Sequence, residues 1–175
     1  MLCIALTMGS LMISSFVSEQ QHTTFPTLHI IMYEELHRHE WRNATASVTG
    51  ENWRFNFEPE SISIRGRGNS TWNLVDKRPF RIRFDEPREM LSSGHRARNW
   101  TLISNHNDFS LMRNYSVYFF AGLLDGMNVA PWAQFVHVYF NGEYKGVYMM
   151  SIQKSEMAYG RVNLTSHLFL RTASS

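Results

Sequence analysis

Apolar and polar residues alternate along much of the chain, and this alternation predicts β-strands. The clearest case is residues 80–84, Phe-Arg-Ile-Arg-Phe, in which the apolar residues form one face and the two arginines form the other. Ile62 and Ile64 alternate with polar residues in the same way. This period of two is typical of a strand with one buried face. We expect further short strands at residues 28–32 and 100–104.

Two pairs of strand-like segments flank turn residues and therefore predict β-hairpins. Residues 134–140 and 143–150 flank Asn141-Gly142, a pair suited to the positive φ angles of a two-residue type I′ turn. Residues 44–49 and 53–57 flank Gly50-Glu51-Asn52. The sequence thus favours short connections between antiparallel strands.

One segment, residues 108–125, has the period of a helix. Its stripe at helical spacing is formed by Leu111, Tyr115, Tyr118, Phe119, Gly122 and Leu123. Asp108, or alternatively Asn107, can cap the start of this helix and Gly126 can end it. We expect the stripe to face a sheet. The predicted fold class is therefore α+β, a largely antiparallel sheet with one long packed helix.

The remaining segments give weaker patterns. Residues 33–43 are charged and fit either a surface helix or an irregular insertion. Residues 85–98 combine Pro, Gly, Ser and charged residues, and we expect them to form a loop. The tail, residues 165–175, gives no clear pattern. We expect the folded portion to span residues 27–164.

The first residues predict an export signal. No charged residue occurs before Glu19, and residues 1–17 are mostly apolar, which is enough for the core of a signal peptide. A basic start and a small-residue cleavage site are absent. We expect residues 1–20 to be a signal-like leader, with no stable membrane insertion beyond it. Five Asn-x-Ser/Thr sequons would carry glycans in a eukaryotic secretory pathway, at Asn43, Asn69, Asn99, Asn114 and Asn163.

Composition narrows the function classes. With 175 residues the chain suits one domain, and its net charge of +2 does not imply a nucleic-acid partner. Cys3 is the only cysteine, so no intramolecular disulfide or cysteine-based metal site can form. No HExxH or Walker motif is present, and a metal role for His37 and His39 is not favoured. The 14 Arg against 3 Lys indicate either ordered anion contacts or a bias in codon usage.

A basic segment punctuated by glycines is the first candidate site. It runs from Arg65 through Gly68 to Trp72 and continues with Lys77-Arg78-Pro79. Glycines let a backbone approach an anion closely, and neighbouring cations can neutralise phosphate oxygens. The other interpretation is a solvated arginine face beside a structural turn. We expect a groove at which Arg65, Arg67, Lys77 and Arg78 converge.

The second candidate lies between a predicted strand and the predicted helix. It consists of Asn105-His106-Asn107-Asp108, followed by Arg113 and Asn114. Strand-to-helix junctions often hold sites, because free helix N–H groups and short polar side chains meet there. The simpler interpretation, which the spacing favours, is that Asp108 caps the helix while the asparagines shape the turn.

At these residues the chain resembles the CotH family of spore-coat, atypical secreted kinases. The motifs occur in the family's order: residues 64–72 (IRGRGNSTW), residues 77–84 (KRPFRIRF), Asn99-Trp100, residues 105–114, residues 141–148 (NGEYKGVY) and residues 160–163 (GRVN). They span nearly all of the chain after the leader. The resemblance implies the N-terminal part of a kinase-like fold that transfers the γ-phosphoryl group of ATP to Ser.

The resemblance also implies roles for individual residues. The nucleotide-phosphate site would comprise Arg65, Arg67, Asn69, Lys77 and Arg78, and the polar junction Asn105, Asp108 and Arg113. Where the family has a Glu, this chain has Ile152, so we expect Lys77 to be less firmly oriented. The family's Asn-Tyr-Asp and Trp-Asp-x-Asp type motifs, which supply its catalytic and metal-binding Asp residues, do not occur. No catalytic residue or metal ligand is therefore assigned.

The resulting expectation is a fragment of a CotH-type kinase. ATP and Mg²⁺ would be its cofactors, a surface or coat protein its substrate, and the secreted or cell-surface fraction, including the spore coat, its location. Without the Asp motifs the chain alone is expected to be close to inert. The alternative is a non-catalytic surface or coat protein that uses the fold for adhesion or assembly.

Overall fold

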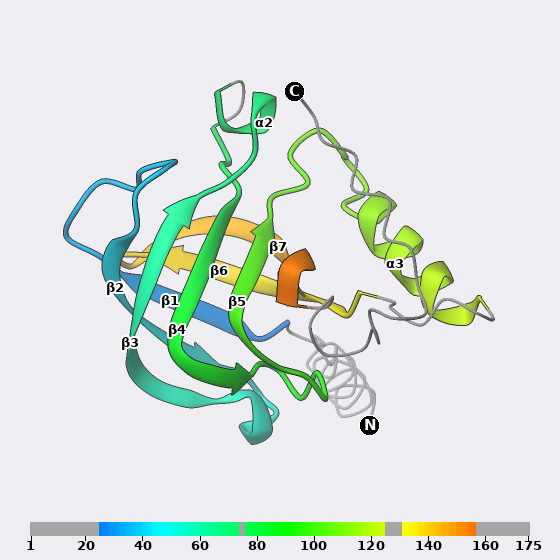
Figure 1. Cartoon of the computed structure of the whole chain (residues 1–175), viewed down its shortest axis with the longest axis horizontal. Helices are drawn as coiled ribbons and strands as arrows, with labels where there is room; N and C mark the ends of the chain where they lie inside the picture. The colour runs from blue at the N-terminus through cyan, green and yellow to red at the C-terminus, as the bar shows by residue number, and fades with distance from the viewer. Residues whose placement is uncertain (1–24, 74–75, 125–130, 157–175) are drawn as a thin grey trace, which may run out of the picture.

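In the computed structural model, which describes residues 25–73, 76–124 and 131–156, seven strands close into one β-barrel (Figure 1). Its strands follow one another around the barrel in the order β1-β2-β3-β4-β5-β7-β6. The elements are β1 (Thr27–Ile31), β2 (Arg42–Thr49), the 3-10 turn η1 (Trp53–Phe55), β3 (Phe57–Gly66), α2 (Ser70–Asn73), β4 (Phe80–Glu89), β5 (Arg96–Ile103), α3 (Arg113–Leu123), β6 (Ala133–Phe140) and β7 (Glu143–Ile152).

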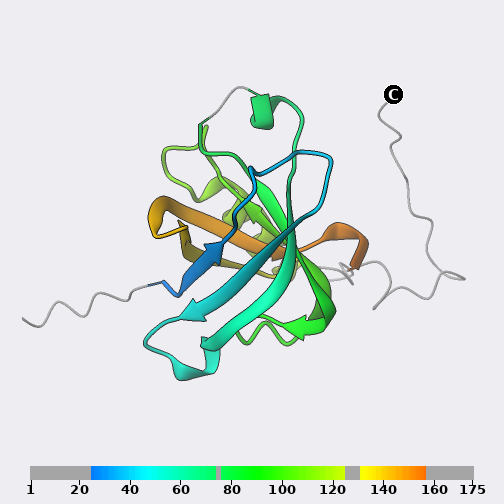
Figure 2. The same cartoon turned by 90° about the vertical axis from the view of Figure 1, so that its left-hand side faces the viewer.

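The barrel is antiparallel except where it closes. Each neighbouring pair is antiparallel apart from β1 and β6, which run parallel from Thr27 opposite His137 to Ile30 opposite Phe140. Figure 2 shows β2 and β3 side by side, with η1 at the end where they are joined. Closure pairs the free edges of β1 and β6, which an open sheet would expose.

The core is the inside of the barrel, filled by alternate residues of its strands. In β4 the pattern is regular: Phe80, Ile82 and Phe84 are buried, and Arg81 and Arg83 between them are only partly so. The largest side chain with no exposed surface is that of Trp100 in β5. The alternation in the sequence therefore reflects strands with one face inside the barrel.

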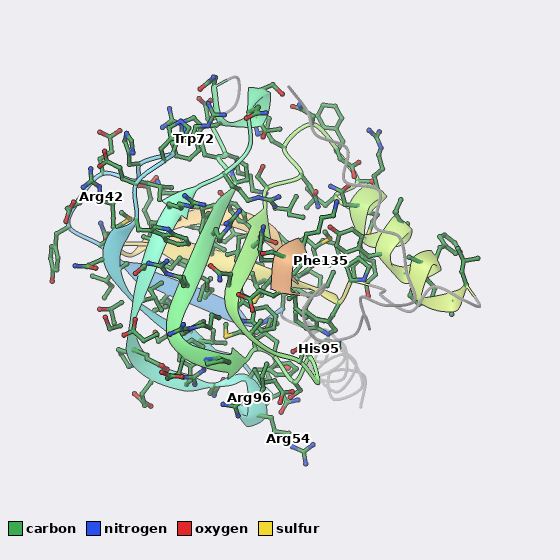
Figure 3. The ribbon with its side chains drawn as sticks, viewed as in Figure 1. Arg42, Arg54, Trp72, His95, Arg96 and Phe135 are labelled. Atoms are coloured by element: carbon green, nitrogen blue, oxygen red, sulfur yellow. The ribbon has the colours of Figure 1, made fainter. Side chains whose placement is uncertain are left out.

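The predicted α+β fold with one long packed helix is wrong. The described fold is mostly β, and α3 covers only Arg113–Leu123, with no buried residue. Phe119 and Leu123 of the predicted stripe are 56% and 64% exposed. Only Tyr115 of that stripe stacks on the barrel, with its ring centroid 5.1 Å from that of Phe135 (Figure 3). The barrel fills its interior with its own strands, so it does not need the helix to cover a core face.

Two further predicted segments, a loop and a strand, are also wrong. The predicted loop, residues 85–98, contains the end of β4 and the start of β5, with Arg88 opposite Ala97. Pro87 lies where the register of this pair shifts, a place where a strand tolerates a residue that cannot donate a hydrogen bond. The predicted strand 53–57 is instead the turn η1, followed by the start of β3 at Phe57.

The predicted hairpin at residues 141 and 142 is confirmed. Phe140 pairs with Glu143, and both turn residues have positive φ, +49° at Asn141 and +83° at Gly142. These are the backbone conformations that a type I′ turn requires. Of the segment 33–43, residues 33–41 are irregular, as one of its two predicted alternatives proposed, and the last two residues begin β2. No helix among the described residues is long and apolar enough to cross a membrane.

Candidate functional site

Described residues of the connection between β3 and β4 line two pockets. We call the first the junction pocket; it has a volume of about 400 Å³ and is lined by Arg67, Gly68, Thr71, Pro79, residues 103–108, Arg113 and Asn114. The second, the loop pocket, has a volume of about 460 Å³ and is lined by residues 34–39, Arg42, Trp72, Asn73 and Arg78.

The junction pocket carries two cationic side chains from different elements. Arg67 follows the last residue of β3, and burial lowers the pKa of its guanidinium, a shift that nearby Tyr118 partly opposes. Among the described residues, no carboxylate lies within ion-pair distance of Arg67. Arg113, the first residue of α3, lines the same pocket and is exposed. Arg67 therefore brings to the pocket a positive charge that no described carboxylate pairs, whereas Arg113 lies close enough to Asp108, which also lines the pocket, to lower the pKa of that carboxyl.

Asn105 organises the polar wall of this pocket. It is 8% exposed and has a φ of +48°, a left-handed conformation that Asn tolerates better than most residues. Its Nδ2 donates to the carbonyl oxygen of Leu111 at 3.0 Å, and its Oδ1 accepts from Nδ2 of Asn114 at 2.7 Å. These bonds tie the end of β5 to the start of α3.

Asp108 holds the turn that leads into α3. Its Oδ2 accepts the backbone N–H of Arg113 at 2.8 Å, and its Oδ1 accepts the hydroxyl of Ser110 at 2.7 Å. The bond from the Ser110 hydroxyl, followed by that from the Arg113 amide, lowers the pKa of the carboxyl. Asp108 thus binds the first amide of the helix, although the helix begins five residues after it and not at Asp108.

The glycines of the basic segment pack against their own connection. A Cβ added at Gly66 would overlap the indole ring of Trp72, and one added at Gly68 would overlap Oγ1 of Thr71. Gly68 also has a φ of +90°, which favours glycine. These glycines therefore make room for α2, whereas the sequence had suggested that they leave the backbone open to a ligand.

Of the five predicted phosphate-binding residues, only Arg67 lines the junction pocket. Nζ of Lys77 donates to the carbonyl oxygen of Val147 at 2.5 Å and lies 4.8 Å from the ring centroid of Tyr148. Burial lowers the pKa of this amine. The guanidinium of Arg78 lies 4.9 Å from the ring of Trp72 and faces the loop pocket.

The other two residues have separate partners. Arg65 lies 4.7 Å from the ring of Trp41 and donates to the carbonyl oxygen of His39 at 3.4 Å. Oδ1 of Asn69 accepts from Nη2 of Arg38 at 2.5 Å. The predicted convergence of Arg65, Arg67, Lys77 and Arg78 in one groove is therefore not found in the described structure.

The structure instead joins the two candidates that the sequence analysis treated separately. Arg67, from the basic segment, lines one pocket together with Asn105, Asp108 and Arg113, from the polar junction. Thr71 and Tyr118 were not predicted to take part. Thr71 stands within the basic segment, but Tyr118 is on α3 and no motif includes it. The proximity of Tyr118 to Arg67 therefore appears only in the tertiary structure.

Residue 152 does not orient Lys77. Ile152 is 7% exposed, belongs to the barrel core and pairs with Trp100. Lys77 contacts Val147, five residues earlier on β7, a separation of about 17 Å along an extended strand. The expectation that an apolar residue at 152 loosens Lys77 is therefore wrong for this structure.

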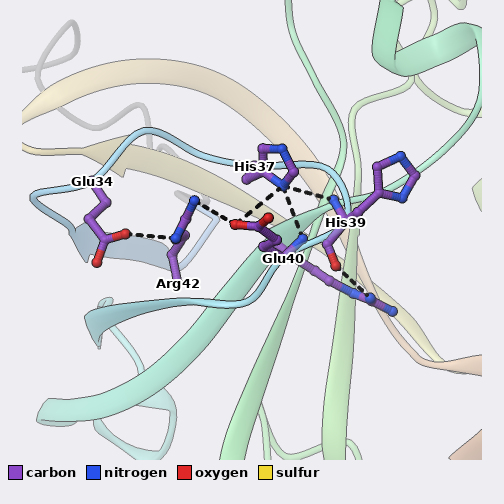
Figure 4. A network of polar contacts seen from close by, with 6 residues as sticks. Glu34, His37, His39, Glu40 and Arg42 are labelled. Carbon is purple, nitrogen blue, oxygen red and sulfur yellow. Dashed lines mark hydrogen bonds and ion pairs between the residues drawn. The ribbon is translucent and has the colours of Figure 1, made fainter.

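The histidines beside the loop pocket belong to a polar network (Figure 4). Nδ1 of His37 lies 3.1 Å from the backbone nitrogen of Glu40, and Arg42 bridges the carboxylates of Glu34 and Glu40 at 3.1 and 2.7 Å. In the part of the chain that the structure describes, no group of three His, Cys, Asp or Glu side chains could hold a metal ion.

Comparison with known proteins identifies the family. The family model described as CotH kinase protein matches residues 64–164, from the end of β3 through the basic segment, the polar junction and the β6–β7 hairpin. No curated protein matches the chain. The matched region covers more than half of the 175 residues and contains both halves of the junction pocket. The chain belongs to the CotH kinase protein family.

Proposed function

We propose that the junction pocket binds the phosphate groups of ATP and that the chain is the nucleotide-binding part of a CotH-type protein kinase. The observation that carries the proposal is the partly buried guanidinium of Arg67, which faces the pocket without a carboxylate partner among the described residues. A cation removed from water is costly unless it is paired. Phosphate oxygens would supply both the counter-charge and the hydrogen bonds that a guanidinium fork prefers.

The proposed reaction is phosphoryl transfer to a Ser of a surface or coat protein. The Ser hydroxyl oxygen bonds to the γ-phosphorus of ATP, the bond from that phosphorus to the β-phosphate oxygen breaks, and the hydroxyl proton is released, which gives phosphoserine and ADP. The described residues do not fit a protein-held Mg²⁺ site, because Asp108, the carboxylate of the junction pocket, already accepts hydrogen bonds from its own turn.

Calorimetric titration with ATP and Mg²⁺ tests the pocket. We expect the chain to bind with a Kd in the high micromolar to millimolar range, which corresponds to about 4–6 kcal/mol. Arg67→Gln should weaken binding about tenfold, because it removes the charge-assisted contact without removing the side-chain stem. Arg96→Gln is the matched control, since this exposed residue lies at the opposite end of the barrel from Trp72 (Figure 3).

Three outcomes have defined meanings. Equal binding by the wild type and by Arg67→Gln would contradict the pocket assignment, provided that thermal melting shows both to be folded. Equal binding by the wild type and by Lys77→Ala would place Lys77 outside the site. A folded chain that binds no ATP would favour the alternative, a non-catalytic surface or coat protein.

We also propose that the protein is exported and acts in the secreted, cell-surface or spore-coat fraction. The support is the uncharged, mostly apolar run of residues 1–17, which lies outside the described residues. N-terminal sequencing of protein recovered outside the cell should show that residues 1 to about 20 have been removed. A cytosolic product that still begins with Met1 would contradict export.

A further inference from the structure

A second group of arginines lies on the outer face of β3 and β4. Arg65 stands directly opposite Arg81. Arg83, two residues after Arg81 and on the same face of β4, stands opposite Ser63. Their neighbours Ile64 and Ile82 are buried inside the barrel, so the three arginines point outward. We call Arg65, Arg81 and Arg83 the outer arginine face.

These three cations have no counter-charge from the described part of the chain. None of their guanidinium groups lies within ion-pair distance of a carboxylate there. Arg65 and Arg81 lie directly opposite each other, and burial, followed by the charges of Arg65 and Arg67, lowers the pKa of Arg81. Like charges directly opposite each other destabilise a pair of strands.

One donor on this face is also unsatisfied. Nε of Arg81 is buried and has no hydrogen-bond partner. An unpaired buried donor costs free energy, but the oxygen of a molecule bound on the surface cannot reach this atom while it is covered. The repulsion between these unpaired cations is therefore the feature that points to an anionic ligand on this surface.

The ring of Trp41 contacts two of these three arginines, Arg65 and Arg83. The guanidinium of Arg83 lies 4.2 Å and that of Arg65 lies 4.7 Å from the centroid of its ring. Arg65 also donates to the carbonyl oxygen of His39. Side chains held in place before binding lose less conformational freedom when a ligand arrives. Arg65 and Arg83 are therefore oriented in advance of any ligand.

We propose that the outer arginine face binds an extended acidic segment of another protein, rich in Asp or Glu. Each guanidinium can form two parallel hydrogen bonds to one carboxylate. Arg81 and Arg83 are two residues apart on one strand, about 7 Å, which is also the spacing of alternate side chains in an extended peptide. This surface adjoins the phosphate pocket proposed above, since the charge of Arg67 acts on Arg81, but neither Arg81 nor Arg83 lines that pocket.

The surroundings favour a peptide over a nucleic acid. Proteins that bind single-stranded nucleic acids stack bases on aromatic side chains. Both Arg65 and Arg83 lie on the ring of Trp41, the aromatic residue beside this face, so that ring is already in use. Contacts to isolated carboxylates need no aromatic surface.

Fluorescence anisotropy with a labelled ten-residue peptide of alternating Asp and Ser tests this proposal. We expect the full chain to bind this peptide, to bind the Asn–Ser peptide at least about tenfold more weakly, and to lose affinity as salt rises. The double variant Arg81→Gln/Arg83→Gln should weaken binding about tenfold or more. The control Arg96→Gln/Arg98→Gln, which removes the same charge from exposed positions of β5, should leave it unchanged.

A variant without a charge change separates orientation from net charge. Trp41→Leu should weaken peptide binding about threefold, because Arg65 and Arg83 lose the ring that holds them. ATP binding by the single variant Arg83→Gln, whose guanidinium lies over Trp41 and does not line the phosphate pocket, should equal that of the wild type, so failure of the peptide experiment is distinguishable from failure of the phosphate pocket.

Three results would overturn the proposal: no binding of the Asp–Ser peptide by the wild type, an equal loss in the β5 control, or binding of a ten-nucleotide oligothymidine as tight as that of the peptide. Thermal melting of each variant confirms that the comparison is made between folded proteins.

Discussion

Tyr148 links the barrel to the β3–β4 connection through one side chain. It is 2% exposed, its hydroxyl donates to the carbonyl oxygen of Arg78 at 3.1 Å, and Nζ of Lys77 lies over its ring. Burial raises the pKa of this phenol to about 12. Because the folded protein holds this proton more tightly than the unfolded chain does, the tyrosine couples stability to alkaline pH.

The raised pKa of Tyr148 predicts that the protein loses stability at alkaline pH. The stabilisation is fully present below pH 10, the usual tyrosine value, and is lost as the pH rises through the folded value of about 12. We expect a loss of about 2–3 kcal/mol in the free energy of unfolding over this window, since one pKa unit corresponds to about 1.4 kcal/mol. Urea denaturation between pH 9 and 12 measures it.

Two variants make this measurement specific. Tyr148→Phe should lose about 1 kcal/mol at pH 8, because the bond to Arg78 is absent, and should then fall less steeply above pH 10. Tyr33→Phe is the control, since its side chain is 99% exposed, and it should follow the wild type. Parallel curves for Tyr148→Phe and the wild type above pH 10 would contradict this role for Tyr148.

At the residue scale, the sequence indicated which segments could form a site but not which of their residues meet. Arg67 and Asn105 are 38 positions apart, and no periodicity or motif connects them. Lys77 was predicted for the phosphate site together with Arg67, but its amine contacts Val147 on β7 and does not line the junction pocket. The direction of a side chain depends on which strands are neighbours, and that is a long-range property.

At the scale of elements, α3 differs most from its predicted role. Its apolar residues have the predicted helical spacing, yet Phe119, Phe120 and Leu123 are more than half exposed. Tyr115 is the residue of its stripe that stacks on a barrel side chain, Phe135. A helical pattern shows that one face is apolar, but it does not show what covers that face.

This difference predicts unequal effects of substitutions on one helix. Phe119→Ser and Phe120→Ser should each change the free energy of unfolding by no more than about 0.5 kcal/mol, as exposed positions usually do. Tyr115→Ala should cost about 1–2 kcal/mol, because the stacked contact with Phe135 is lost. Guanidinium denaturation compares them. A cost for Phe119→Ser as large as that for Tyr115→Ala would show that the predicted stripe is covered after all.

At the scale of the whole molecule, one turn residue helps to close the barrel. The backbone N–H of Asn141 donates to the carbonyl oxygen of Ile30, and its side chain both donates to the carbonyl oxygen and accepts the N–H of Met32, at 2.8 and 2.9 Å. The β6–β7 turn therefore binds the end of β1, whose pairing with β6 completes the barrel.

Substitution of Asn141 should separate turn geometry from barrel closure. Asn141→Gly keeps a residue suited to positive φ but loses both side-chain bonds to Met32, so we expect a cost of about 1–2 kcal/mol. Asn141→Ala should cost about 1 kcal/mol more than Asn141→Gly, because Ala is strained at the positive φ of this position. Thermal unfolding should therefore rank the wild type above Gly and Gly above Ala. Equal stability of the wild type and Asn141→Gly would mean that the side-chain bonds do not hold β1.

The sequence by itself determined most of the strands, their inward faces and the type I′ hairpin, since alternation and turn residues act over a few neighbouring positions. It also contained the motifs that identify the family. Only the tertiary structure decided that the sheet closes into a barrel, because the parallel pairing of β1 with β6 joins residues more than 100 positions apart. The same closure leaves α3 outside the core and brings Arg67 to the polar junction, since the packing of distant segments is set by the whole barrel and not by any local pattern.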